Sequence, residues 1–414
     1  MKHRKKTKPL PPRQVAQKVI ERLHRHGCQA LLAGGCVRDM LLNRRPNDYD
    51  VATNAAPETV ASIFPRTLTV GAQFGVVVVL IGARQIEVAT FRSDLSYTDG
   101  RRPDKIVFTD ARADAQRRDF TINGMFYDPI EQKIIDYVGG QKDLKKQVIR
   151  AIGEPVARFK EDHLRMLRAL RFACRLNFSI ETKTWRALIN HAPKLKLVSP
   201  ERIAAELEHI LIDPNRTRGL QLILESKLSR QVFPSLNHKK LLSGIDVIRH
   251  LPQRCSFALA LAALLSEFNP NDVAKTCRHL RTSNDLRKQT RWLVENCEPL
   301  LKSIPLNRGP LKKWLNEPLF EPLVQLTRCR LKARQLPDSP LRQLHRQIKE
   351  LGDEPITPPR LLDGHELIRL GAQPGPMVGQ LVEELYLAQL ENHVNNKSDA
   401  QKWTQKWLQK HKSE

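Results

Sequence analysis

Long apolar runs are missing from this sequence of 414 residues, and none approaches the ~20 residues needed to span a bilayer. The N-terminus, MKHRKKTKPLPPR, is basic but lacks the apolar centre of a secretory signal. We therefore expect residues 1–12 to form a basic disordered arm, and we expect no attachment to a membrane.

Cysteine is scarce and shows no metal-binding or disulfide pattern. The seven cysteines are odd in number, and no two of them form a C-x-x-C pair. This usage predicts neither a disulfide framework nor a zinc site, and it is typical of a reducing cytoplasm. The sequence also lacks a solenoid repeat, a long low-complexity tract and the His-Asp dipeptide that would mark a hydrolase domain.

Acidic residues are too few to balance the basic ones. Asp and Glu number 44 against 69 Lys and Arg, which gives a formal net charge of +25. Such a surplus favours a polyanionic partner, and nucleic acid is the leading candidate. A membrane surface is a weaker interpretation because no basic amphipathic anchor stands out. A basic proteome or a basic tail would also explain the excess of Lys and Arg, but this excess is not confined to the termini.

The stretch LLAGGCVRDMLLNRRPNDYD, residues 31–50, carries the most informative pattern. An apolar run is broken by Gly34 and Gly35 and resumes as an amphipathic helix. Glycine lets backbone N–H groups approach a phosphate without an intervening Cβ atom. Arg38, one turn into that helix, would add a charge-assisted contact. Taken alone, a Gly-Gly turn before a helix is most often only a turn.

Two carboxylates follow this turn. The alternation Asp-Tyr-Asp-Val predicts a strand in which Asp48 and Asp50 share a face. A pair of carboxylates beside bound phosphates is the usual protein contribution to a Mg²⁺ site, although such a pair alone is more often a solvated strand end.

Three further strands are predicted over residues 67–70, 75–81 and 85–91, where β-branched residues are frequent. The run VVVVL is apolar on both faces, which is typical of a central strand covered on both sides. Glu87 lies in the third of these strands and is a candidate third carboxylate for two-metal chemistry. An ordinary exposed strand glutamate is an equally good interpretation.

A polar segment, RSDLSYTDGRRPD, follows at residues 92–104 and is expected to be a mobile loop. A charged helix over residues 111–119 then leads into RRDFTIN. Its arginines and aspartate, read alone, indicate a surface salt-bridge cluster.

A helix is predicted over residues 156–176, where an apolar stripe accompanies a row of charged residues. The row consists of Asp162, Arg165, Arg168 and Arg171. An ordinary salt-bridged helix surface explains this spacing. Beside a nucleotide, Asp162 would accept from an exocyclic amine and Arg165 would donate to the adjacent ring nitrogen. Cytosine and adenine share that pair of groups, whereas uracil and guanine present the reverse pattern.

Three strings carry a family resemblance. GGCVRDMLLNRRPNDYDVAT resembles the head domain of the class II tRNA nucleotidyltransferase and bacterial poly(A) polymerase branch of the DNA polymerase β superfamily. RRDFTIN resembles the second signature of that family, and EDHLRMLRALRF resembles its base-reading motif, Glu-Asp-x-x-Arg. The resemblance is strong over residues 29–212 and returns faintly in ITPPRLLDGHELIRLGAQPGPMVGQLVEEL.

The resemblance implies an α+β protein with a small mixed-sheet nucleotidyltransferase head followed by an all-α neck, body and tail. The head is expected over residues 13–153 and the neck, with the base-reading motif and an RNA-binding region, over 154–230. The body and the tRNA-binding tail would follow at 231–350 and 351–414.

Site residues also follow from the resemblance. Catalysis and Mg²⁺ binding are expected from Asp48 and Asp50. Nucleotide binding is expected from Gly35, Arg38, Arg118, Asp162, Arg165, Arg168 and Arg171. Supporting roles are expected from Gly34, Glu87, Asp119 and Asn123, and, in the mobile loop associated with the terminal A, from Asp99, Arg101 and Arg102.

The implied activity is template-independent addition of CCA, from CTP and ATP, to the 3′ end of tRNA, with pyrophosphate leaving. An enzyme that adds only the final A beside a partner enzyme and a poly(A) polymerase stay open as alternatives. A non-catalytic RNA-binding protein on an inherited fold is the alternative from another class, and the intact carboxylates count against it. The sequence is silent on the oligomeric state.

Overall fold

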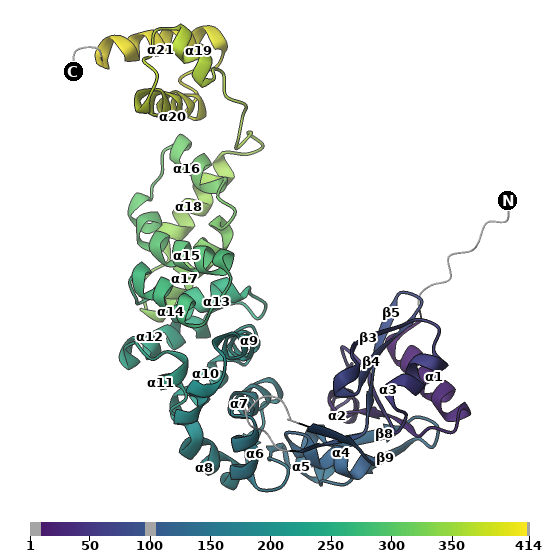
Figure 1. Ribbon diagram of the computed structural model, residues 1–414. Coiled ribbons are helices and arrows are strands. Elements are labelled where there is room, and N and C mark those ends of the chain that lie inside the picture. Colours follow the sequence, from purple (N-terminus) through teal and green to yellow (C-terminus); the bar gives the residue numbers. More distant parts are fainter. Residues whose placement is uncertain (1–9, 96–104, 412–414) are drawn as a thin grey trace, which may run out of the picture. The chain divides into compact units, whose positions relative to one another are not determined.

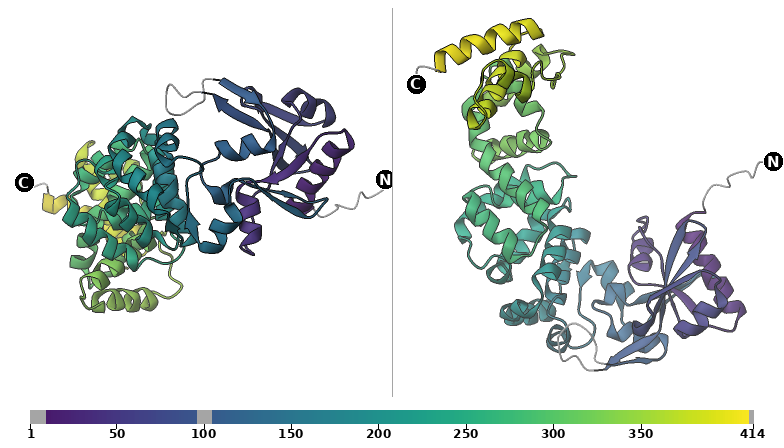
Figure 2. Two further views of the ribbon diagram at one scale, coloured as in Figure 1. Left: turned by 90° about the horizontal axis from the view of Figure 1, so that it is seen from below. Right: turned by 45° about the horizontal axis from the view of Figure 1, so that its top comes forward.

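The structure is a computed structural model that describes residues 10–95 and 105–411. The chain forms two compact units. The first contains the described residues up to Ser235 together with His279–Arg281, and the second contains Leu236–Arg278 and the residues from Thr282 onward. In Figures 1 and 2 the large sheet lies in the N-terminal part of the chain, and helices make up nearly all of the remainder. The predicted α+β class is confirmed.

A seven-stranded mixed sheet organises the described part of the first unit. Its neighbours are antiparallel except for the parallel pair β2 and β5. In spatial order the strands are β3 (Thr67–Gly71), β4 (Val76–Ile81), β5 (Arg84–Thr90), β2 (Asp50–Thr53), β1 (Ala30–Ala33), β8 (Met125–Asp128) and β9 (Lys133–Asp136). Two small sheets pair β6 (Arg92–Leu95) with β7 (Lys105–Phe108) and β10 (Val148–Ile149) with β11 (Ser179–Ile180).

Helices cover this sheet because short apolar strands need a second layer to bury their side chains. The helices of this region are α1 (Pro12–Arg25), α2 (Gly35–Leu41), α3 (Pro57–Ile63), α4 (Ala111–Arg117) and α5 (Gly140–Lys146). Helices α1 and α3 pack on each other. Helix α1 also packs on β1, β2 and β5, and α3 packs on β3, β4 and β5. Helix α4 places Ala111 and Ala115 against Leu31, Phe91 and Phe126, which form one buried cluster with neighbouring alanines.

Strand β4 departs from the sequence-based expectation. Its apolar run predicts burial on both faces, but only Val77 and Val79 are fully buried, at 0% exposure. Val76 and Val78 are partly exposed. The strand is second from the edge of the sheet, and Val78 borders a cavity that also contains Glu87.

The helical remainder of the first unit is built from α6 (Pro155–Glu161), α7 (Arg165–Leu176), α8 (Thr182–His191), α9 (Pro200–Leu211), α10 (Arg216–Glu225) and α11 (Ser229–Val232). The prediction of a single helix over residues 156–176 is wrong. Asp162 has extended backbone angles, φ −146° and ψ 106°, and its carboxylate accepts from the N–H of Leu164. Aspartate competes with helix formation through such local bonds, so the chain ends α6 and restarts as α7.

The described part of the second unit consists of helices. They are α12 (His238–Arg249), α13 (Phe257–Leu264), α14 (Pro270–His279), α15 (Asn284–Ser303), α16 (Arg308–Leu315), α17 (Phe320–Ala333), α18 (Ser339–Glu350), α19 (Gly364–Arg369), α20 (Pro376–Leu390) and α21 (Lys397–His411). The last three helices share a buried cluster that includes Leu367, Leu381 and Trp407. The domain boundaries expected within the two units stay predictions.

None of the helices in residues 10–95 and 105–411 has the length and apolar character needed to cross a bilayer. No disulfide joins the seven cysteines, all of which lie in the described ranges.

Two glycines of the second unit offer a matched test of its packing. A Cβ atom at Gly244 in α12 would lie 2.0 Å from the carbonyl oxygen of Leu264 in α13, whereas one at Gly379 in α20 would meet nothing within 4 Å. Gly244→Ala should therefore lower the free energy of unfolding by about 1–3 kcal/mol. Gly379→Ala should raise it by about 0.5–1 kcal/mol, because alanine favours an exposed helix. Urea unfolding measures both, and equal shifts in the two variants would contradict the close approach of α12 and α13.

Candidate active site

The turn between β1 and α2 brings the sequence-predicted groups together. Gly34 has φ +73°, a conformation that side chains with a Cβ atom rarely adopt, and α2 begins at the next residue. The antiparallel register of β1 and β2 pairs Ala33 with Asp50. Asp50 is therefore fixed beside the Gly34-Gly35 turn by strand pairing, although fourteen residues lie between it and Gly35 in the sequence.

Strand β5 contributes a further carboxylate at the same place. The parallel register pairs Val51 with Val88, so the preceding residues, Asp50 and Glu87, are neighbours across the two strands. Burial raises the pKa of Asp50 to about 6, the negative charges of Asp48 and Glu87 add to this effect, and Arg118 opposes it. At Asp50, burial and the two neighbouring carboxylates thus outweigh the opposing charge of Arg118.

These carboxylates fit a divalent cation that is shared with a phosphate ligand. In the described part of the chain, no group of three or more His, Cys, Asp or Glu side chains is arranged to hold a metal by itself. Mg²⁺ keeps several waters and is usually bound through one or two carboxylates plus substrate phosphates. A carboxylate pair beside an arginine-lined cavity is consistent with that preference.

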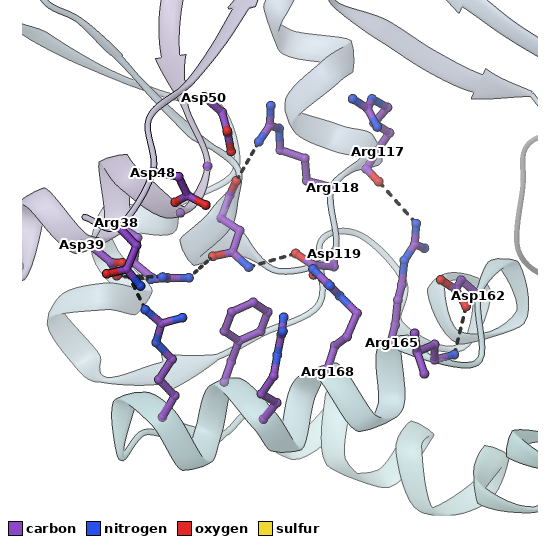
Figure 3. Close-up of a pocket in the computed structure, with 18 of the residues that line it drawn as sticks. Arg38, Asp39, Asp48, Asp50, Arg117, Arg118, Asp119, Asp162, Arg165 and Arg168 are labelled. Atoms are coloured by element: carbon purple, nitrogen blue, oxygen red, sulfur yellow. Dashed lines mark hydrogen bonds and ion pairs between the residues drawn. The ribbon is translucent and has the colours of Figure 1, made fainter. Parts of the chain in front are cut away.

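A cavity of about 630 Å³ lies beside the carboxylates, within the size range of small-molecule sites. Eight arginines and five aspartates line it, a surplus of three positive charges. The arginines are Arg38, Arg117, Arg118, Arg165, Arg168, Arg171, Arg175 and Arg202. The aspartates are Asp39, Asp48, Asp50, Asp119 and Asp162. Figure 3 shows Arg165 and Arg168 extending from α7 toward the loop that carries Arg118 and Asp119.

Arg118 is held against the Gly-Gly turn. Its guanidinium donates to Asp114, with N···O distances of 2.9 and 3.1 Å, and lies 5.1 Å from the ring centre of Phe126. A Cβ atom at Gly34 would lie 2.8 Å from Nη1 of Arg118. The absence of a side chain at Gly34 therefore makes room for this guanidinium as well as permitting the turn.

Arg38 is buried, with 3% of its surface exposed, and does not extend freely into the cavity. Its guanidinium donates to Asp39 at 2.8 Å and to the side-chain oxygen of Asn123 at 2.7 Å. Asn123 in turn donates to Asp119 at 3.1 Å. These bonds connect α2 to the segment that carries RRDFTIN.

Helix α7 presents two arginines that carboxylates fix in place. Arg168 donates to Asp119 at 2.6 and 2.9 Å. Arg171 lies 3.1 Å from Glu206 of α9. Both guanidinia, as well as that of Arg38, lie within about 5.5 Å of the ring centre of Phe172. The ring face attracts the cations, and it fills the space between them.

Asp119 and Arg168 form an ion pair that shifts the pKa of both groups. Burial alone would raise the pKa of Asp119, but the guanidinium of Arg168, the amide of Asn123 and the N–H of Phe120 lower this pKa to about 2. The neighbouring charges raise the pKa of Arg168 despite its burial. Both groups are therefore charged throughout the physiological range.

Asp162 and Arg165, expected one turn apart on a single helix, are instead separated by the break between α6 and α7, and the N–H of Arg165 donates to the carbonyl of Asp162 at 3.1 Å. Asp162 pairs with Arg202 of α9 at 2.9 Å. Arg165 donates to Glu161 at 2.5 Å and to the carbonyl of Arg158 at 3.0 Å. The side chains of Asp162 and Arg165 both border the same cavity. Each has its own ion-pair partner there.

The cavity collects nearly every residue that the sequence singled out. Gly34, Gly35, Asp119 and Asn123 border it together with the carboxylates and arginines already described. Glu87 instead borders an adjoining cavity of about 400 Å³, which shares Asn47, Asp48 and Asp50 with the first. Asp99, Arg101 and Arg102 lie outside the described residues.

Sequence reasoning missed several cavity residues. Arg202 and Glu206 stand four residues apart on α9 and pair with cavity groups, and Asp39 pairs with Arg38 and, at 3.7 Å, with Arg175. The spacing of Arg202 and Glu206 indicates only a charged helix face. The position of both residues within 29–212, where the family resemblance is strong, was the one available signal.

Comparison with known proteins agrees with this geometry. A family model described as "Poly A polymerase head domain" matches residues 30–150, and "Probable RNA and SrmB- binding site of polymerase A" matches 177–240. The CCA-adding enzyme of Lactobacillus delbrueckii subsp. bulgaricus is 34% identical, covering 93% of this chain and 95% of that protein. That of Lactococcus lactis subsp. cremoris is 41% identical, covering 68% and 71%.

Solved structures give the same result. The CCA-adding enzyme of Bacillus stearothermophilus in complex with CTP has a TM-score of 0.79 and 28% identity, covering 98% of this chain and 100% of that one. The Thermotoga maritima CCA-adding enzyme complexed with tRNA_CCA, with a TM-score of 0.65 and 21% identity, covers 97% of each chain and supports the fold alone.

The fold and the site together define a nucleotidyltransferase, with a Gly-Gly turn, strand carboxylates and a basic cavity joined to a helical region. Within that class, the chain belongs to the CCA-adding enzymes of the class II tRNA nucleotidyltransferase and poly(A) polymerase family.

The lowered pKa of Asp119 predicts a specific pH dependence of stability. A carboxyl whose pKa is lower in the folded than in the unfolded state stabilises the fold above its unfolded pKa, and that stabilisation is lost as the pH falls toward the folded value. From ~4 in the unfolded chain to about 2 in the folded one, the shift corresponds to roughly 2–3 kcal/mol. Asp119→Asn should therefore lower the free energy of unfolding by that order at pH 6.

The loss of unfolding free energy caused by Asp119→Asn should become smaller as the pH falls from 5 to 3. Urea unfolding at pH 6 and pH 3 measures it. Asp246→Asn, at an exposed ion pair with Arg249, is the control and should change little at either pH. A deficit for Asp119→Asn that is independent of pH would contradict the proposed coupling to Arg168.

Proposed function

We propose that this protein adds CCA to the 3′ end of tRNA, using CTP and ATP and releasing pyrophosphate. The observation that carries the proposal is a single cavity that joins Asp48 and Asp50 to a cluster of arginines. Named CCA-adding enzymes match this chain over 93% of its length. A relative of 28% identity has been solved with CTP.

The arginine-rich side of the cavity suits a triphosphate. Guanidinia on fixed supports are well placed for phosphate oxygens because their donors form a rigid planar fork. Arg118, Arg168 and Arg171 each keep a carboxylate partner that sets their direction. Gly34 and Gly35 border the cavity where α2 begins, and neither has a side chain that would keep a phosphate from the backbone.

Asp48 and Asp50 would hold Mg²⁺ together with the phosphates of the nucleotide, and Glu87 is the candidate third carboxylate. When bound there, Mg²⁺ would supply a lowered pKa for the attacking 3′-hydroxyl and compensation for charge that develops on the α-phosphate. The pairing of β1, β2 and β5 positions Asp50 and Glu87. The strand expected to hold both aspartates begins only at Asp50, so Asp48 lies in the segment that precedes it. The raised pKa of Asp50 is consistent with a site built for added positive charge.

Base selection is assigned to Asp162 and Arg165. Asp162 accepts from the exocyclic amine of cytosine or adenine, and Arg165 donates to the ring nitrogen. Each side chain is already oriented by a neighbour, Arg202 for Asp162 and Glu161 for Arg165. We propose that these partners hold the two base-reading groups apart at a fixed separation, which the break between α6 and α7 allows.

The helical region is proposed to bind the acceptor arm of tRNA through phosphates and helix shape. The net charge of +25 and the match of residues 177–240 to an RNA-binding model support this assignment. We also propose the head, neck, body and tail as the four domains of the chain. A cytoplasmic location is proposed as well, and cysteines that form no disulfide support it.

Two members of the same family stay as alternatives, an enzyme that adds only the final A and a poly(A) polymerase. The match to a poly(A) polymerase head favours keeping the second. Incubation with tRNA transcripts that end before the first C, and with others that end after the second C, separates the three. Extension of both to CCA is expected. Extension of the second alone would indicate the A-adding enzyme, and long A tails on either would indicate the polymerase.

Asp50→Asn should abolish both extensions while tRNA binding stays within about twofold of the wild-type value, because the substitution removes a carboxylate charge and retains the shape of the side chain. Glu58→Gln, at an exposed position of α3, is the matched control and should extend both transcripts normally. Radiolabelled nucleotide incorporation at saturating Mg²⁺ measures the effect. Normal incorporation by Asp50→Asn would remove the proposed role of this carboxylate.

Asp162→Ala should relax base choice. Loss of the acceptor removes the preference for an exocyclic amine, so UTP incorporation should rise relative to CTP by about tenfold, within the ~1–3 kcal/mol typical of base discrimination by paired hydrogen bonds. Competition between labelled UTP and CTP measures the ratio, and Glu208→Gln, exposed on α9, serves as the control. An unchanged ratio would mean that another group reads the base.

A further inference from the structure

One aromatic ring, that of Phe172 in α7, lies among three guanidinium groups of the catalytic cavity. The ring centre is 4.6 Å from Cζ of Arg171, 5.3 Å from Cζ of Arg38 and 5.5 Å from Cζ of Arg168. Phe172 also borders the cavity, although only 6% of its surface is exposed. An aromatic side chain therefore stands where a carboxylate would compensate more charge, so its presence needs a reason other than charge balance.

The ring of Phe172 is itself held in place by a second ring. Phe120, which is fully buried, meets it edge to face, with ring centres 5.8 Å apart and ring planes at 76°. Arg38 belongs to α2, which begins at the Gly-Gly turn, whereas Arg168 and Arg171 belong to α7. The ring therefore sets the separation between the cation of α2 and the two cations of α7.

An aromatic face can hold a guanidinium without using its hydrogen-bond donors. A guanidinium has five N–H donors, and the ring attracts the cation through its π face. Arg168 directs Nε and Nη2 to Asp119, and its Nη1 lies 3.8 Å from Glu206, beyond hydrogen-bond distance. This Nη1 can donate to a phosphate oxygen. A carboxylate in place of Phe172 would compete for that donor, whereas the ring does not.

We propose that Phe172 is a positioning residue of the triphosphate site, where its ring holds three arginines at a fixed spacing and leaves N–H donors for the phosphates. The proposal rests on the proposed function in taking a nucleoside triphosphate as the ligand of this cavity. It goes beyond that function in assigning part of the phosphate affinity to the electrostatic potential of a ring face. Phe172 has no contact with the reacting atoms in this proposal and no part in base choice.

The test replaces Phe172 in the full chain by phenylalanines that carry one, two or three ring fluorines. Fluorine withdraws electron density from the ring face, so it weakens the attraction for cations while the ring keeps nearly the same size. The control is the same series at Phe320 of α17, which is also 6% exposed. Within residues 10–95 and 105–411, no cation lies over the ring of Phe320.

Calorimetry measures the binding of CTP, ATP and tripolyphosphate in the presence of Mg²⁺. Tripolyphosphate offers the phosphates without a base. Each added fluorine at Phe172 should raise the Kd for all three ligands, and three fluorines should raise it by about tenfold. The Phe320 series should bind all three ligands as the wild type does. The ratio of UTP to CTP incorporation should stay at the wild-type value in both series.

Phe172→Leu is a second variant, which keeps an apolar side chain but removes the ring face. It should weaken the binding of all three ligands at least as much as the trifluorinated ring does. Thermal unfolding shows whether this variant folds. The fluorinated rings fill the space of the natural one, so they test the proposal even where Phe172→Leu lowers stability.

Other outcomes overturn the proposal in distinguishable ways. A constant Kd across the Phe172 series would show that the ring acts by packing alone. An equal trend in the Phe320 series would trace the effect to fluorination in general, and a changed ratio of UTP to CTP along the Phe172 series would assign the arginines to base reading. Each of these results refutes the proposal and leaves the proposed function intact. Failure of the wild type to bind any of the three ligands would refute the proposed function as well.

Discussion

The catalytic cavity depends on keeping many like charges close together. Two positive charges about 5 Å apart repel by about 3 kcal/mol at an effective dielectric constant of 20. The protein offsets this repulsion with buried or partly buried carboxylates, among them Asp39, Asp114, Asp119 and Glu206, and with the ring of Phe172 between three guanidinia. Each carboxylate also fixes the orientation of the guanidinium with which it pairs. The same contacts therefore compensate the charge and preorganise the site.

The two basic regions of the molecule differ in how their cations are supported. In the first unit, arginines such as Arg168 are held by carboxylates at hydrogen-bonding distance, which suits a small ligand whose reacting atoms need fixed positions. In the second unit, basic side chains such as Arg346 and Lys349 of α18 are exposed to solvent. Flexible, solvated cations suit a long polyanion, where many weak contacts are averaged and salt competes with all of them.

Local chain geometry explains why the prediction of a single helix over residues 156–176 was wrong. The row from Asp162 to Arg171 has helical periodicity, but the carboxylate of Asp162 bonds the N–H of Leu164 and ends the helix. Arg165 then pairs with Glu161 and Asp162 pairs with Arg202. Periodicity cannot distinguish a continuous helix from two helices with a short break, because the apolar positions on either side of the break still face the same core.

The sequence by itself determined the class of fold, the Gly-Gly turn, the carboxylate pair and the arginine row. Each of these features depends on residues that are close together in the chain, so it can be recognised without knowledge of tertiary contacts. The tertiary structure alone decided the partners. Glu87 reaches Asp50 through the register of β2 and β5, and Glu206 and Arg202 reach the cavity from α9, forty or so residues along the chain. Ion pairs between distant segments depend on packing and strand register, and no local pattern encodes which carboxylate will meet which guanidinium.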